Sequence, residues 1–189
     1  FEVKPNSVFA IVGESGSGKS TIAKLMAGFF DADDGRIYFG DQDVKSIPTS
    51  QLMKHVAYVA QDNFLFDTSI RENLKIAKAD ATDEEIQAAL KAANCLELIE
   101  RLPEGLNSNA GDCGKFLSGG ERQRITLARA MLADAQCIIL DEATAYADVE
   151  NEAKIQEALS RLMKDKTLIV VAHRLNTIVG ADQIMVLGH

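Results

Sequence analysis

The sequence predicts an α/β fold in which a mainly parallel β-sheet alternates with helices and is interrupted by a helical insertion. Short apolar runs rich in Val and Ile indicate strands that are buried on both faces, as in parallel sheets. Helical periodicity between the runs indicates an open sheet that binds ligands at the carboxyl ends of its strands. The expected buried strands span residues 7–12, 56–60, 137–140, 167–172 and 183–187, and a shorter, half-buried strand spans 36–39.

The middle of the chain differs because helical patterns follow one another there without a convincing strand. The expected helices of this part span residues 69–77, 83–102 and 119–132. Two further helices, 19–28 and 151–164, alternate with the expected strands. We therefore predict a core made of two segments and, between them, a helical subdomain. The core comprises residues 1–61 and 134–189, and the helical subdomain comprises 62–133.

Length and composition favour an ordinary globular domain. The chain has 189 residues, of which 47% are hydrophobic and 25% charged, and its net charge is −8. This charge argues against binding nucleic acid duplexes, which needs clustered Lys and Arg. Cys95, Cys113 and Cys137 are odd in number and far apart, so we expect reduced thiols in a cytosolic compartment. No apolar run approaches the ~20 residues that cross a bilayer. The start at Phe1 leads us to expect a fragment of a longer polypeptide.

A glycine-rich segment after the first expected strand carries the most specific motif. Its glycines let the backbone curl so that successive N–H groups face phosphate oxygens, and the following helix adds its positive end. In the P-loop pattern, Lys19 reaches the β- and γ-phosphates and the Ser20 hydroxyl coordinates Mg²⁺. The segment comprises Gly13, Glu14, Ser15, Gly16, Ser17, Gly18, Lys19, Ser20 and Thr21.

Two carboxylates follow an apolar strand much later in the chain. Asp141 ends the strand 137–140 at the same sheet edge as the P-loop, where an acidic residue can hold Mg²⁺ directly or through water. Glu142 comes next and can orient or deprotonate an attacking water. Together with the P-loop, the pair predicts hydrolysis of a nucleoside triphosphate.

A second helix start has the features of an anion site. Ser118 is a natural N-cap, and Gly119 and Gly120 leave backbone N–H groups open to an approaching anion. Since the first phosphate site is already complete, this one makes sense if two copies meet head to tail. Each copy would then cover the nucleotide of the other with Ser118, Gly119, Gly120 and Glu121.

These motifs together closely resemble the ATP-binding-cassette (ABC) family, in family order and over essentially the whole chain. The Q-loop glutamine is Gln61, the signature spans 117–121, the D-loop aspartate is Asp148 and the switch histidine is His173. The resemblance implies a P-loop NTPase core of the RecA-like type with an inserted α-helical subdomain. The family's antiparallel β subdomain is represented here only by the segment around 36–39.

The resemblance also implies cofactors and residue roles. The cofactors are ATP and Mg²⁺. Gln61 would contact Mg²⁺ and the attacking water and link the nucleotide to the helical subdomain. His173 would hydrogen-bond the γ-phosphate and help orient Glu142, while Asp148 would join the two sites across a dimer.

Within the family, two segments look like the exporter branch, residues 65–73 and 172–178. This implies substrate export driven by ATP hydrolysis, on the cytoplasmic face of a membrane. The partners would be a second nucleotide-binding domain and a transmembrane domain, with no nucleic acid. The family's adenine-stacking aromatic would lie upstream of Phe1. The alternatives are an importer motor, a chromosome-maintenance ATPase of the same superfamily and a small P-loop kinase.

Three segments depart from the family pattern. The signature ends in Glu121, where the family most often has Gln, which adds a negative charge near the predicted site on the partner copy. Asp112 stands where the corresponding exporter loop usually has Glu. The D-loop reads Ala-Tyr-Ala before Asp148, in place of the usual Ser-Ala-Leu.

Overall fold

A computed structural model describes residues 1–141, 149–162, 165–172 and 180–188. Its contacts divide the chain into two compact units. The first unit comprises the described residues within Phe1–Tyr58, Ala135–Glu142 and Asp165–His189, and the second those within Val59–Asp134 and Ala143–Lys164.

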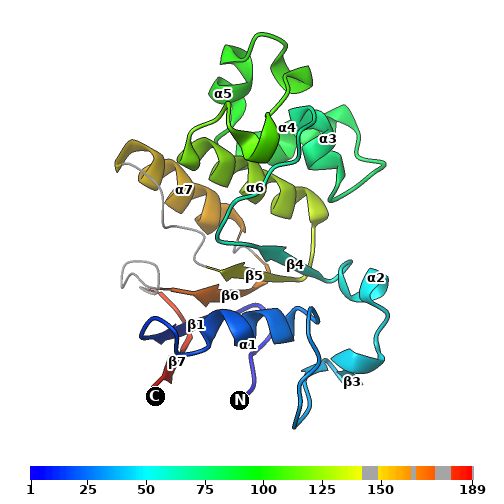
Figure 1. The fold of residues 1–189 in the computed structure, drawn as a ribbon, viewed down its shortest axis with the longest axis vertical. Helices are drawn as coiled ribbons and strands as arrows, with labels where there is room; N and C mark the ends of the chain where they lie inside the picture. The colour runs from blue at the N-terminus through cyan, green and yellow to red at the C-terminus, as the bar shows by residue number, and fades with distance from the viewer. Residues whose placement is uncertain (142–148, 163–164, 173–179, 189) are drawn as a thin grey trace. The chain divides into compact units, whose positions relative to one another are not determined.

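A five-stranded sheet organises the first unit (Figure 1). The strand order is β4-β5-β6-β1-β7, and the pairs β5–β6, β6–β1 and β1–β7 all run parallel. This sheet confirms the predicted α/β class. Its strands are β1 (Val8–Gly13), β4 (Val56–Val59), β5 (Cys137–Asp141), β6 (Thr167–Val171) and β7 (Gln183–Leu187).

Alternate residues of the strands form one hydrophobic cluster of this unit, because successive side chains of a strand point to opposite faces. Phe9 and Ile11 of β1 pack in one cluster with Cys137 and Ile139 of β5 and with alternate residues of β6. Helix α1 (Lys19–Met26) adds Ala23 to the cluster. Burial raises the pKa of Cys137 to about 11, so its thiol stays protonated and behaves as an apolar side chain.

The prediction that residues 183–187 form a buried strand is wrong in one respect. The strand forms, but Ile184 is 51% and Val186 73% exposed. The reason is the strand order, which places β7 at the edge of the sheet beside β1.

The segment predicted as a strand at 36–39 forms a small antiparallel sheet with its neighbour. The two strands are β2 (Tyr38–Phe39) and β3 (Gln42–Asp43). They are followed by a 3₁₀ turn, η1 (Val44–Ser46), and by α2 (Thr49–Leu52), which the sequence analysis did not predict.

The second unit is helical, and α6 (Gly119–Ala133) is its central helix. Ile125, Leu127 and Ala128 of α6 are completely buried, and the helix is in contact with α3, α4 and α7. The other helices are α3 (Ile70–Lys75), α4 (Asp83–Ala92), α5 (Leu96–Arg101) and α7 (Val149–Leu162), with 3₁₀ turns at η2 (Gly105–Asn107) and η3 (Asp112–Gly114). Helix α7 groups with these helices, although it lies outside the predicted helical subdomain 62–133. The predicted division into an ATP-binding core and a helical subdomain therefore remains a proposal.

The prediction of one helix over 83–102 is wrong, since the structure has two helices, α4 and α5. Asn94 lies between them with φ 55°, in the left-handed region that Asn tolerates better than most residues. Its side-chain amide donates to the Lys154 carbonyl at 3.0 Å and to a carboxylate oxygen of Glu157 at 2.8 Å, both on α7. These contacts favour the turn over a continuous helix.

Among the residues that the structure describes, no helix combines the length and the apolar character that a membrane crossing requires.

Candidate functional site

The predicted phosphate loop lies between β1 and α1, where the backbone requires glycine. Gly16 has φ 82° and Gly18 has φ 92°, both in the left-handed region that side-chain-bearing residues rarely adopt. Glu14, Ser15 and Gly16 are exposed at the loop. The backbone is therefore curled and accessible, as an anion cradle requires.

Lys19 begins α1 and points back into this loop. Its ammonium donates to the carbonyl oxygens of Gly13 at 3.0 Å and Glu14 at 2.7 Å, and the residue is only 4% exposed. Within the described residues, no carboxylate forms an ion pair with it. A buried positive charge whose partners in the described part of the chain are neutral carbonyls favours an incoming anion.

Two hydroxyl groups close to Lys19 in the chain fit a phosphate with a metal ion. The Ser17 hydroxyl is buried and has no hydrogen-bond partner within the described part of the chain. The Ser20 hydroxyl donates to Oδ1 of Asp141 at 2.7 Å, which leaves its oxygen lone pairs available. Hydroxyl and carboxylate oxygens are the ligand types that Mg²⁺ prefers. Ser20 and Asp141 could therefore hold Mg²⁺, and the structure brings these two predicted ligands together.

Tyr58 is a member of this cluster that the sequence analysis missed. Its hydroxyl donates to Oδ2 of Asp141 at 2.6 Å, and Asp141 is 4% exposed. The ring of Tyr58 meets Phe29 edge to face at a centroid distance of 5.0 Å. Its place near the end of β4, on the strand beside β5, was the available signal. Tyr58 and Ser20 thus fix both oxygens of the carboxylate.

Removing the Tyr58 hydroxyl is expected to destabilise the protein. Tyr58→Phe keeps the ring but leaves the buried Asp141 with one donor fewer, which should lower the free energy of unfolding by about 1–2 kcal/mol. Urea denaturation measures the change. Tyr38→Phe is the control, because Tyr38 is 56% exposed and the same change there should stay within about 0.5 kcal/mol. Equal changes in both variants would contradict the role of the Tyr58 hydroxyl.

The predicted second anion site starts α6 in the helical unit. The Ser118 side chain accepts from the Glu121 N–H at 3.3 Å, and the Glu121 carboxylate accepts from the Ser118 N–H at 2.8 Å. This reciprocal capping box leaves the N–H groups of Gly119 and Gly120, at the first two helical positions, outside the cap. The Ser118 hydroxyl uses only its oxygen in the cap, so its hydrogen can be donated to a ligand.

Glu121 also forms an ion pair with Arg101, the last residue of α5. Burial alone raises the pKa of Glu121, but hydrogen bonds from Ser118 and Arg101 outweigh burial and lower it below the usual value. The carboxylate is therefore charged at neutral pH.

The remaining predicted residues lie elsewhere. Gln61 is exposed and belongs to the second unit, just after β4. Thr21 is exposed on α1. Glu142, Asp148 and His173 lie outside the described residues. Within the described part of the chain, no group of three His, Cys, Asp or Glu side chains forms a further metal site.

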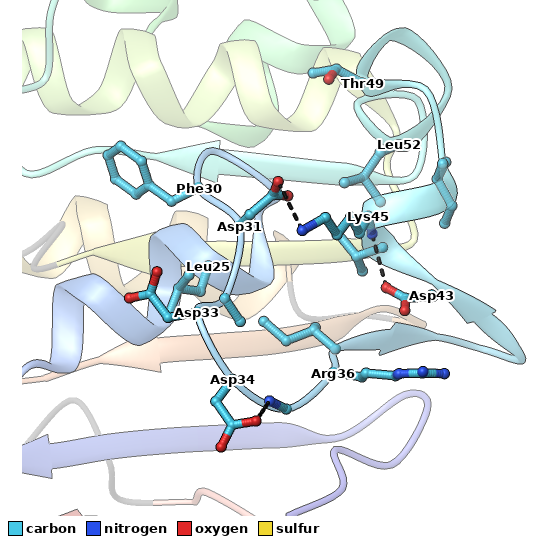
Figure 2. Close-up of a pocket in the computed structure, with 16 residues that line it drawn as sticks. Leu25, Phe30, Asp31, Asp33, Asp34, Arg36, Asp43, Lys45, Thr49 and Leu52 are labelled. Atoms are coloured by element: carbon cyan, nitrogen blue, oxygen red, sulfur yellow. Dashed lines mark hydrogen bonds and ion pairs between the residues drawn. The ribbon is translucent and has the colours of Figure 1, made fainter.

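A pocket of about 530 Å³ in the first unit is a poor site for a nucleotide (Figure 2). The Asp31 carboxylate and the Lys45 ammonium pair at 3.3 Å beside it. No predicted site residue that the structure describes lines this pocket. Carboxylates outnumber cations in its lining, which disfavours a polyphosphate: the charged side chains are Asp31, Asp33, Asp34, Asp43, Arg36 and Lys45.

The family follows from comparison with known proteins. The model of the ABC transporter family matches residues 1–145, which contain the phosphate loop, the signature helix and the acidic strand end. The chain belongs to the ABC transporter family. This confirms the family that the motifs indicate.

Three curated proteins illustrate the similarity. The chain is 47% identical over 189 residues to the "Heavy metal tolerance protein" of Schizosaccharomyces pombe, covering 100% of this chain and 23% of that protein. It is 47% identical over 188 residues to the "ATP-dependent lipid A-core flippase" of Xanthomonas oryzae pv. oryzae, covering 99% of this chain and 32% of that protein. It is 48% identical over 186 residues to the "Mycobactin import ATP-binding/permease protein IrtA" of Mycolicibacterium smegmatis, covering 98% of this chain and 22% of that protein.

A solved structure supports the same ABC assignment. The bacterial Atm1-family ABC exporter with ATP bound matches with a TM-score of 0.92 and 39% sequence identity, over 100% of this chain and 33% of that one. The chain therefore spans between about a fifth and a third of the length of its relatives.

Proposed function

We propose that this chain binds ATP with Mg²⁺ and hydrolyses the γ-phosphate, as the nucleotide-binding domain of a transporter. The observation that carries the proposal is the group formed at the phosphate loop by the buried Lys19 and Asp141 and the partly buried Ser20. A buried ammonium, a hydroxyl with available oxygen lone pairs and a fixed carboxylate at one loop provide the groups that a metal-bound triphosphate needs.

The residues of the loop bind and orient the phosphates. The backbone N–H groups of Glu14 to Thr21 hold the β- and γ-phosphates, and Lys19 moves its hydrogen bonds from two carbonyls to phosphate oxygens. Ser20 and Asp141, with Gln61 as the predicted third ligand, would hold Mg²⁺, which would supply electrostatic stabilisation of the developing charge. Tyr58 keeps the Asp141 carboxylate in place.

Three predicted residues act at the γ-phosphate and the attacking water. Glu142 accepts a proton from the water, and Gln61 helps to position it. His173 donates a hydrogen bond to the γ-phosphate and orients Glu142. Water attacks phosphorus, the bond to the β-phosphate oxygen breaks, and ADP and inorganic phosphate leave.

A second copy of the domain completes each site. Ser118, Gly119, Gly120 and Glu121 of one copy would lie against the γ-phosphate bound to the loop of the other copy. Asp148 would connect the two sites. The N–H groups of Gly119 and Gly120 and the Ser118 hydroxyl hydrogen, which the capping box does not use, support this arrangement.

The coupled process is export across a membrane, with the domain on the cytoplasmic face and joined to a transmembrane domain. The flippase relative and the Atm1-family exporter support this direction. Import by a protein of the same architecture is the second candidate, because a relative at 48% identity is an import ATP-binding/permease protein.

The proposal is tested by measuring release of phosphate from ATP by the purified chain. We expect turnover with Mg²⁺ and its loss when EDTA removes the metal. Tight ATP binding without any turnover, or turnover that persists in EDTA, would contradict the proposal.

A further inference from the structure

The acidic residue of the signature performs two separable tasks. One oxygen of Glu121 accepts from the Ser118 N–H at 2.8 Å and so holds the cap of α6. The other oxygen pairs with Arg101, which reaches it from the end of α5. A glutamine at this position could accept the same backbone hydrogen bond through its carbonyl oxygen, so only the charge distinguishes the two side chains.

The charge of Glu121 opposes the proposed ligand. The carboxylate belongs to the third residue of the helix, in the same turn as the N–H groups of Gly119 and Gly120 that would face a γ-phosphate. A negative charge in that turn repels a phosphate, and the repulsion is only partly screened because the Glu121 side chain is 14% exposed. The Arg101 guanidinium lies against the carboxylate and offsets this charge.

We infer that Arg101 is a positioning residue for the partner's nucleotide: it neutralises Glu121 so that the start of α6 accepts the γ-phosphate of a second copy. The inference rests on the proposed ATP-driven pairing of two copies. It explains how an acidic signature can work, because the charge that it adds is compensated within the helical unit. Arg101 would be needed only while residue 121 is charged.

A double-mutant cycle tests the inference in chains that carry Glu142→Gln to stop hydrolysis. The measurement is the Mg-ATP concentration at half-maximal dimer, by sedimentation. Since the Arg101 side chain is 67% exposed, Arg101→Ala should raise this concentration by only about three- to tenfold. Arg101→Lys should bring the Mg-ATP concentration at half-maximal dimer most of the way back to that of the Arg101 parent. Glu121→Gln should lower the concentration about twofold, and adding Arg101→Ala to Glu121→Gln should change nothing further.

Two controls separate charge compensation from folding. Arg71→Ala breaks another ion pair of the helical unit, Arg71 with Asp83, and should leave the ATP requirement unchanged. The effect of Arg101→Ala should also shrink at about 1 M salt, where the screening length is roughly 3 Å. Thermal melting of each variant checks that the monomer remains folded.

The outcomes are distinct. An equal effect of Arg101→Ala with and without Glu121→Gln, or no effect in either case, would overturn the inference. Absence of ATP-dependent dimers in every variant, including the Arg101 and Glu121 parent, would contradict the proposed pairing itself. The ion pair would then contribute only to folding stability.

Discussion

Replacing Glu142 by glutamine is expected to leave Mg-ATP binding within about twofold and to slow hydrolysis by about 10²–10⁴. Glu142 directly follows Asp141, whose carboxylate is fixed by Ser20 and Tyr58. The amide keeps the shape of the side chain but cannot accept a proton from water. Single-turnover hydrolysis of bound ATP measures the chemical step apart from product release.

The control is Glu84→Gln, which makes the same chemical change at an exposed residue of α4 and should leave hydrolysis unchanged. Loss of ATP binding in Glu142→Gln, with an unchanged single-turnover rate, would contradict the role of Glu142 as the base.

Replacing Lys19 by alanine should weaken ATP binding by about 1.5–3 kcal/mol, which is roughly ten- to 150-fold in Kd. Lys19 is 4% exposed, and its ammonium is held by carbonyls of the loop itself. The variant therefore loses the cation of the cradle together with two hydrogen bonds that keep the loop closed. Titration calorimetry with Mg-ATP measures the change.

Lys24→Ala provides the matched control, because Lys24 lies in the last turn of the same helix and carries the same charge. Its affinity should stay close to that of the parent chain. Equal losses in the two variants would mean that net charge, and not the Lys19 ammonium in the loop, governs affinity.

The sequence could predict the features that depend on local pattern. The burial of Phe9, Ala10 and Ile11 on both faces of β1 follows from their apolar run, and the left-handed Gly16 and Gly18 follow from the phosphate-loop spacing. The proximity of Ser20, at the start of α1 after β1, to Asp141, at the end of β5, follows from the sheet edge that these two strands share.

Features set by contacts between distant segments could not be predicted in this way. Asn94 breaks the helix because α7, about 60 residues later, offers acceptors to its amide. Ile184 and Val186 are exposed because the strand order places β7 at the edge. The ion pair between Arg101 of α5 and Glu121 of α6 depends on the path of the loop between these two helices. Local sequence patterns do not determine that path.

The most direct test of the account is sedimentation velocity with Mg-ATP, comparing Glu142→Gln alone with Glu142→Gln combined with Ser118→Arg. Arginine at the cap fills the space where a partner's γ-phosphate would lie and removes the hydroxyl that caps α6. The account predicts that ATP produces dimers, over a series of protein concentrations, for the first variant, and monomers for the second. ADP should leave both monomeric, because it lacks the bridging γ-phosphate. Dimers of equal stability in both variants with ATP would contradict the claim that two copies of this chain enclose the nucleotide.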